Sequence, residues 1–158
     1  MTTVDRTPTE RVLSSEADAS HMTATVRDYM VSEVETLGPD DSLETAVMLE
    51  RRFRIRHIPI IDDGELVGIV TDHDLKRALP SPGSDQQTFE HVVQTTRLRQ
   101  IMTRSPMTIS PTAPLRDAVQ ILCEKKFGAL PVVEKGKLVG IISGVDMLRA
   151  FLAFLDKQ

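Results

Sequence analysis

Apolar and polar positions along the chain predict two β-hairpins, each followed by a helix. The stretch 57–71, "HIPIIDDGELVGIVT", has two apolar runs around an Asp-Gly pair, and 129–143, "ALPVVEKGKLVGIIS", has the same form around Lys-Gly. Asp-Gly readily adopts the positive φ angles of a tight hairpin turn. The residues that follow, "TDHDLKRAL" and "SGVDMLRAFLAFL", predict helices that begin at Thr71 and Ser143.

An amphipathic helix is predicted before each hairpin. In "VETLGPDDSLETAVMLERRF" a short extended piece passes through Gly38 and Pro39 into a helix with Ser42 as its N-cap, and "APLRDAVQILCEKKF" repeats this pattern. The predicted buried faces are Leu43, Ala46, Val47 and Leu49 in the first helix, and Leu115, Ala118, Val119, Ile121 and Leu122 in the second. Each half of the chain therefore predicts the order strand, helix, strand, strand, helix.

The two halves are copies of one unit. Residues 26–79 align without a gap with residues 98–151, and 16 of the 54 aligned positions are identical. Two copies are too few, and each is too large, for a typical solenoid. We therefore expect an α+β fold in which two units face each other across a pseudo-two-fold axis.

The repeat also predicts how the chain divides. Residues 1–22 are polar and aperiodic and predict a flexible tail. The first unit is predicted at 23–80, the second at 98–153, and residues 154–158 finish the last helix. Between the units, 81–97 opens with Pro and Gly residues and predicts a linker with one helical turn around 89–93.

The amino-acid composition argues against nucleic acids and membranes as binding partners. The chain has 158 residues, of which 41% are hydrophobic, but no Trp and only one Tyr, and its net charge is −4. Nucleic-acid binding is disfavoured because it needs a concentrated positive surface and, for single strands, aromatic platforms. No apolar run reaches transmembrane length, and no signal-peptide core is present, so a cytoplasmic protein that does not bind membranes is predicted.

The single cysteine, Cys123, cannot form an internal disulfide. It falls within an apolar-periodic segment, where a buried structural thiol is expected.

Each hairpin ends in a hydroxyl residue followed three positions later by aspartate. Thr71 with Asp74, and Ser143 with Asp146, fit the pattern of a helix cap, in which the carboxylate also favours the positive end of the helix dipole. The same two groups, at the mouth of a cleft, could hold the vicinal hydroxyls of a ribose, because a carboxylate accepts both protons. The two roles are compatible.

With its hairpin repeats "HIPIIDDGELVGIVTDHDL" and "ALPVVEKGKLVGIISGVDM", the chain resembles a tandem pair of CBS domains, also called a Bateman module, over about residues 23–153. The resemblance implies two clefts between the units and adenosine-containing ligands there: AMP, ADP, ATP or S-adenosylmethionine. It implies that Thr71, Asp74, Ser143 and Asp146 grip ribose. Residues Ile55, Arg56 and His57 of the first unit, and Phe127, Gly128 and Ala129 of the second, would line the adenine or reach phosphate.

The two units differ just before the second strand. "ERRFRIRH" is rich in cations, whereas "EKKFGA" ends in small uncharged residues. A charge run on a helix is usually a solvated face, which is the interpretation we favour for Arg51 and Arg52. Arg56 and His57 lie beside the expected cleft, and for them we favour phosphate contact.

No catalytic function is predicted. The motif at 72–74, "DHD", points its side chains in different directions on a helix, and no metal-ligand cluster, nucleophile motif or Walker loop is present. The alternative to a ligand sensor is a ligand-independent scaffold for dimerisation or protein interaction. The apolar helix end could serve as a homodimer surface, or pack in the core; it consists of Met147, Leu148, Phe151, Leu152 and Leu155.

Overall fold

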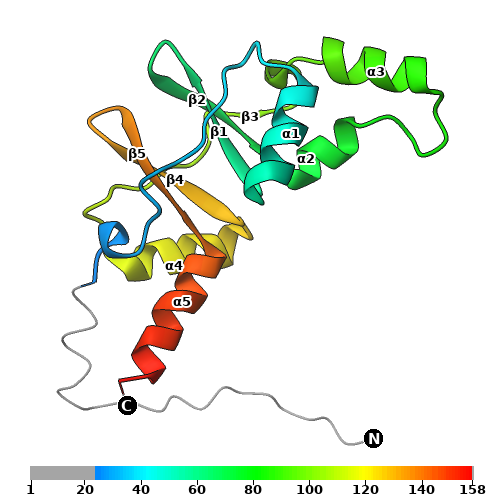
Figure 1. The fold of residues 1–158 in the computed structure, drawn as a ribbon. Coiled ribbons are helices and arrows are strands. Elements are labelled where there is room, and N and C mark those ends of the chain that lie inside the picture. Colours follow the sequence, from blue (N-terminus) through cyan, green and yellow to red (C-terminus); the bar gives the residue numbers. More distant parts are fainter. Residues whose placement is uncertain (1–23, 158) are drawn as a thin grey trace, which may run out of the picture.

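The computed structural model describes residues 24–157; the predicted tail at 1–22 lies outside them. The elements are η2 (Val26–Asp28), α1 (Leu43–Phe53), β1 (His57–Asp62), β2 (Glu65–Thr71), α2 (Asp72–Ala78), α3 (Gln86–Thr95), η3 (Leu98–Gln100), β3 (Thr103–Arg104), α4 (Leu115–Lys125), β4 (Ala129–Glu134), β5 (Lys137–Ser143) and α5 (Gly144–Leu155). The two hairpins lie next to each other, and their helices lie on the outside (Figure 1). The predicted α+β architecture is confirmed.

Both predicted hairpins are present. Strands β1 and β2 pair antiparallel, as do β4 and β5, and the registers are equivalent in the two units. The turn residues Asp63, Gly64, Lys135 and Gly136 all have positive φ, between 48° and 79°. This conformation matches the right-handed twist of the flanking strands, as the Asp-Gly signal predicted.

The first strand predicted in each unit is reduced to a single bridge. Leu37 bridges Ile60 in parallel, and Ile109 bridges Val132 in the same way. The amide of Leu37 donates to the carbonyl of Pro59 (3.2 Å), and the amide of Ile61 donates back to Leu37 (2.9 Å). The predicted extended piece is thus present but pairs at one residue, because the chain turns at Gly38-Pro39 directly after the bridge, and proline has no N–H to continue a ladder.

The units exchange the first segments of their repeats. Val26, with Tyr29 and Met30 beside it, packs in the core of the second hairpin, while Leu98, Ile101 and Met102 pack in the core of the first. Correspondingly, β3 pairs with β2, so the first sheet has the order β1-β2-β3.

A methionine and a glycine fit together at both of these crossovers. A Cβ placed on Gly68 would lie 2.5 Å from Sδ of Met102, and one on Gly140 would lie 2.7 Å from Sδ of Met30. Only a residue without a side chain leaves room for the sulfur at these sites. The reciprocal contacts hold the two units together in the pseudo-two-fold arrangement.

The predicted helix faces are correct for most positions. Ser42 caps α1 by accepting from the amide of Thr45 (3.2 Å), and the buried face of α4 is formed by Ala118 and Leu122. Val119 is 39% exposed, and Cys123 is exposed as well, so both of these predictions were wrong. Cys123 follows Leu122 directly, and successive residues on a helix point in directions about 100° apart.

The linker holds more structure than predicted. Instead of one turn it contains α3, ten residues long, capped by Asp85, which accepts from the amide of Thr88 (2.9 Å). Val93 on this helix is buried in the core of the first unit. None of the helices within residues 24–157 has the length and apolar character needed to cross a lipid bilayer.

Candidate functional site

Within each unit, the start of the hairpin lies beside its end. The register pairs His57 with Thr71, and Ala129 with Ser143. Backbone bonds tie the same segments together, because the amide of Asp72 donates to the carbonyl of Arg56 (3.0 Å), as that of Gly144 does to Gly128 (3.1 Å). The segments 55–57 and 127–129 therefore lie next to the hydroxyl-and-aspartate pairs.

The two units meet at these same segments. The imidazole of His57 lies against Gly128 of the other unit, so that a Cβ on Gly128 would be 2.5 Å from its Nε2. The structure thus brings together all four segments that the sequence singled out. Their side chains differ: Arg56 and Phe127 are exposed, whereas Ala129 is buried and Ile55 packs against the core of the first unit.

The predicted helix cap is formed in the first unit. Oδ2 of Asp74 accepts from the amide and the hydroxyl of Thr71, both at 2.8 Å, and Oγ1 of Thr71 accepts from the amide of Asp74 (3.2 Å). This is a capping box, which satisfies amides that the helix itself cannot. Asp74 is half-buried.

The second unit has the same cap with one addition. Oδ2 of Asp146 accepts from the amide of Ser143 (2.8 Å) and from its hydroxyl (2.6 Å). The other oxygen, Oδ1, accepts from Nη1 of Arg149 (3.1 Å). Asp146 is only 5% exposed. The pairing with Arg149 was not anticipated from the sequence, although Arg is identical at the equivalent positions 77 and 149.

The cap alone does not identify a ligand site. Thr25 and Asp28 form a third capping box at η2, where Asp28 accepts from the amide (2.7 Å) and hydroxyl (2.9 Å) of Thr25. These hydrogen bonds, the backbone one most strongly, hold the pKa of Asp28 below its ordinary value. The capping prediction is confirmed at both predicted pairs, and the ribose role stays a prediction.

Asp74 also lines a cavity. Its volume is about 250 Å³, and its other walls come from α2 and from η3 with the residue after it: Arg77, Ala78, Gln100 and Ile101. The first carboxylate therefore lies next to open space.

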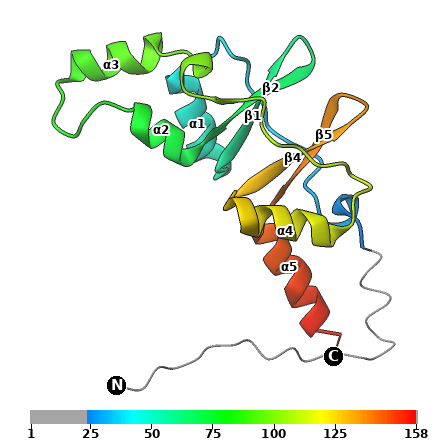
Figure 2. The ribbon, with the colours of Figure 1, turned by 180° about the vertical axis from the view of Figure 1, so that it is seen from behind.

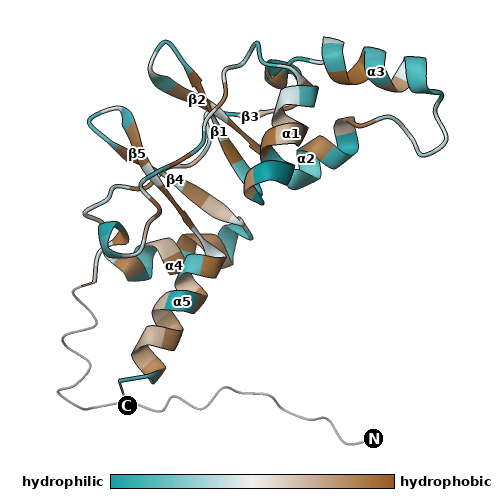
Figure 3. Ribbon diagram, viewed as in Figure 1, coloured by the Kyte–Doolittle hydropathy of each residue, from teal (hydrophilic) through white to brown (hydrophobic). Residues whose placement is uncertain are grey.

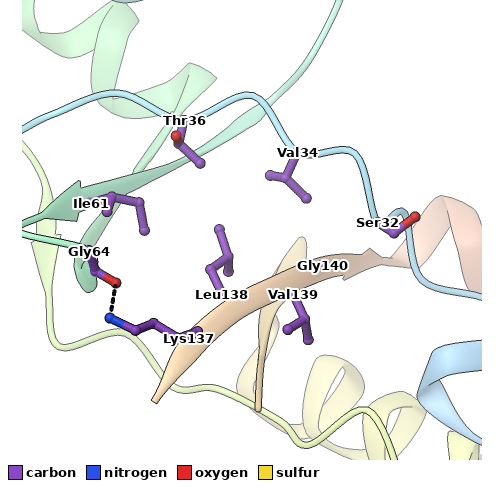
Figure 4. Close-up of a pocket in the computed structure, with 9 residues that line it drawn as sticks. All are labelled: Ser32, Val34, Thr36, Ile61, Gly64, Lys137, Leu138, Val139 and Gly140. Atoms are coloured by element: carbon purple, nitrogen blue, oxygen red, sulfur yellow. Dashed lines mark hydrogen bonds between the residues drawn. The ribbon is translucent and has the colours of Figure 1, made fainter. Parts of the chain in front are cut away.

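A further cavity of about 240 Å³ lies between the two hairpins (Figure 4). Its walls include residues of the segment before α1, between Ser32 and Thr36, the turn residue Gly64 of the first hairpin, and strand β5 of the second from Lys137 to Gly140. Across it, Nζ of Lys137 donates to the carbonyl of Gly64 (3.2 Å). This contact joins the hairpin of the second unit to that of the first and was also not anticipated.

The electrostatic surroundings of His57 favour the neutral imidazole. Burial lowers its pKa below 6.5; the nearby Asp72 acts in the opposite direction, and the Arg56 guanidinium lowers it further. A neutral imidazole has one donor and one acceptor nitrogen. Within residues 24–157 no three His, Cys, Asp or Glu side chains gather as a candidate metal site.

Comparison with known proteins identifies both repeats. A model of the CBS domain matches residues 26–81 and 98–153. Among curated proteins, the CBS domain-containing protein YhcV of Bacillus subtilis is 29% identical over 124 residues, which are 78% of this chain and 83% of YhcV. Some other relatives are enzymes, of which the chain spans only 22% or 23% of the length.

Two similar solved structures contain adenosine derivatives. CBSX2 of Arabidopsis thaliana in complex with AMP is 32% identical, with a TM-score of 0.69 over 82% of this chain and 97% of that one. The CBS domain pair of protein MJ0100, in complex with 5-methylthioadenosine and S-adenosyl-L-methionine, is 25% identical, with a TM-score of 0.70 over 83% and 98%.

Proposed function

The chain belongs to the CBS domain family, as a tandem pair, and from this premise we propose that it is a regulatory module that binds an adenosine-containing ligand between its two repeats. AMP, ADP, ATP and S-adenosylmethionine are the candidates. The observation that carries the proposal is the meeting of four segments, 55–57, 71–74, 127–129 and 143–146, at the contact between the units. Similar CBS-pair structures contain AMP or S-adenosylmethionine.

The aspartates are proposed to hold ribose. In each cap one carboxylate oxygen, Oδ2, already accepts two hydrogen bonds. A carboxylate has about four lone-pair directions, so Oδ1 is the oxygen that a pair of ribose hydroxyls would meet. The capping bonds hold the carboxylate in position for this contact, so Thr71 and Ser143 contribute to binding by positioning it.

The base and phosphate contacts are assigned to the segments before the second strand. Small or apolar positions, namely Ile55, Phe127, Gly128 and Ala129, suit the flat adenine ring. Arg56 is exposed and has no ion-pair partner among the residues that the structure describes, so it is free to meet a phosphate. A guanidinium binds two phosphate oxygens at once, and the neighbouring His57 can donate a further hydrogen bond.

We assign no enzymatic activity to the chain. The two matched CBS segments account for most of the described residues, and the function proposed for them is to sense a metabolite on behalf of a partner protein.

A homodimer is part of the proposal. Helix α5 extends beyond the body of its unit (Figures 1 and 2) and is largely apolar (Figure 3). Its outward side chains are exposed: Val145, Leu148, Phe151, Leu152 and Leu155. An apolar patch of this kind marks an interaction surface, and a second copy would cover it with the same surface. If this surface acts without any ligand, the chain is a scaffold, which is the competing function.

Calorimetric titration of the purified chain with AMP, ADP, ATP and S-adenosylmethionine tests the proposal. We expect saturable binding of at least one of them, and its loss when both Asp74 and Asp146 are changed to Asn. GMP provides the control for base selectivity. Absence of binding by all four adenosine compounds, from a folded dimer, would favour the scaffold.

A further inference from the structure

The two candidate ribose carboxylates are not equally available. In the second unit, every oxygen of Asp146 is engaged: Oδ2 by Ser143, and Oδ1 by the guanidinium of Arg149 at 3.1 Å. The side chain of Asp146 is 6% exposed, so little of it is open to solvent. A ribose that meets Oδ1 must therefore share this oxygen with the Arg149 guanidinium or displace it.

The first unit lacks this contact. Its equivalent arginine, Arg77, makes no hydrogen bond or ion pair with Asp74, and Oδ1 of Asp74 has no partner within residues 24–157. Asp74 is half-buried and borders a cavity of about 250 Å³, of which Arg77 forms part of the wall. The same residue types at equivalent positions thus leave one carboxylate open and the other covered.

The two arginines lie in helices of different length. Helix α2 ends at Ala78, so Arg77 lies in its last turn. Helix α5 continues to Leu155, so Arg149 lies in the middle of a regular helix. In both helices the arginine follows the aspartate by three residues, on the same face, where it can reach the carboxylate. In the structure only Arg149 forms this contact.

From this asymmetry we infer that the two adenosine sites fill in order, the Asp74 site first and the Asp146 site second, with Arg149 as the residue that sets the order. The inference rests on the proposed function, because it concerns the same two carboxylates. The Arg149 guanidinium acts as an internal competitor for Oδ1 of Asp146. The second site is then occupied only at higher ligand concentration.

The strength of this competition is limited. The side chain of Arg149 is 70% exposed, so water and salt screen its pairing with Asp146. Removal of the guanidinium should tighten the second site by about fivefold, which corresponds to roughly 1 kcal/mol, the upper range for an exposed ion pair. Arg149 therefore adjusts the affinity of this site and does not abolish binding.

To measure one site at a time, the aspartate of the other site is changed to Asn. In an Asp74→Asn background only the Asp146 site keeps its carboxylate, and there Arg149→Ala should tighten AMP binding about fivefold. The matched variant is Arg77→Ala in an Asp146→Asn background, where no gain is expected because Asp74 has no arginine to release. Isothermal titration of both pairs with AMP measures the change, and melting temperatures verify that all variants are folded.

The order of filling and the binding of adenosine ligands give different results in these titrations. Two sites of equal affinity in the unmodified protein, or no gain from Arg149→Ala, would overturn the inference and leave the adenosine function intact. A similar gain from Arg77→Ala would also overturn it, since the effect would then come from general charge. Failure of the unmodified protein to bind AMP, ADP, ATP or S-adenosylmethionine would overturn the inference and the proposed function together.

Discussion

The imidazole of His57 occupies the space that Gly128 of the other unit leaves open by having no side chain. The repeat aligns His57 with Ala129 and Gly128 with Arg56, so the pseudo-two-fold axis brings a large residue of one copy against a small one of the other. At this contact the imidazole of "RIRH" therefore fits against the glycine of "KFGA". This contact adds to the two methionine–glycine contacts and the Lys137–Gly64 hydrogen bond that also join the units.

Substitution of Gly128 by Ala should therefore weaken the contact between the units. The added methyl would lie 2.5 Å from Nε2 of His57, so the ring must shift. Overpacking of this kind costs about 1–3 kcal/mol. Urea denaturation followed by circular dichroism measures the loss. Gly144→Ala is the matched control, since a Cβ on Gly144 meets no atom within 4 Å and its stability should not fall.

A second substitution, at His57, tests whether collision with the imidazole causes the loss of stability in Gly128→Ala. In His57→Ala, the ring that collides with the new methyl is absent, so Gly128→Ala should cost much less in that background. Equal losses in both backgrounds would contradict the proposed collision and would point to a backbone effect at position 128.

Stability should also depend on the protonation of His57. Its pKa in the folded protein is lowered below 6.5, chiefly by burial, so the unfolded chain binds this proton more readily than the native state. The free energy of unfolding should then fall as the pH drops through 6.5 towards the folded-state pKa, and this contribution should not change further below that pKa. Urea midpoints between pH 8 and pH 5 measure the effect, and His57→Gln should remove it. Identical pH profiles for the two proteins would contradict the prediction.

The hairpins and the caps could be predicted from sequence because their signals are local. Asp63-Gly64 specifies a turn through its own backbone preferences, and Thr71 caps a helix that begins at the next residue. The repeat then made the second copy as predictable as the first. The conformation of a tight turn and the capping of a helix do not depend on where the other unit lies.

The features that were not predicted depend on the arrangement of distant segments. The sequence repeat shows Met30 and Met102 at equivalent positions, but not that each packs on a glycine of the other unit. Arg77 and Arg149 are also equivalent in sequence, yet only Arg149 pairs with its aspartate, and the three-residue spacing that both pairs share does not predict this difference. Cys123 was misplaced because apolar character alone does not say which side of α4 a residue occupies.

The apolar face of α5 should hold two copies together. Changing both Leu148 and Leu152, which are exposed on this helix, to Lys would place two like charges in the proposed interface on each copy. We expect light scattering at tens of micromolar to show a dimer for the unmodified protein and a monomer for this variant. Phe89→Lys, at an exposed position on α3, should remain a dimer. A monomeric unmodified protein would contradict the proposed homodimer.

Asn substitutions separate capping from ribose binding. In Asp74→Asn the amide oxygen can still accept from Thr71, so unfolding should become easier by less than about 1 kcal/mol. Binding of an adenosine ligand should weaken by about 1–3 kcal/mol, the range for hydrogen bonds to a charged group. Calorimetry and thermal unfolding on the same variant measure the two effects. Reduced stability with unchanged affinity would assign the aspartate to capping alone.

Arg56 should discriminate nucleotides from nucleosides. It is exposed beside the contact between the units and has no ion-pair partner among the described residues, so its guanidinium is available for two phosphate oxygens. Arg56→Ala should weaken AMP by about 1–3 kcal/mol and leave adenosine nearly unchanged, since the variant removes a charged hydrogen-bond donor and no contact to ribose or base. Asp74→Asn should weaken both compounds alike, because both present the same ribose. Titration of the unmodified protein and the two variants with AMP and adenosine makes the comparison. Equal losses of the two compounds in Arg56→Ala would show that Arg56 does not bind phosphate and belongs to the solvated face with Arg51 and Arg52.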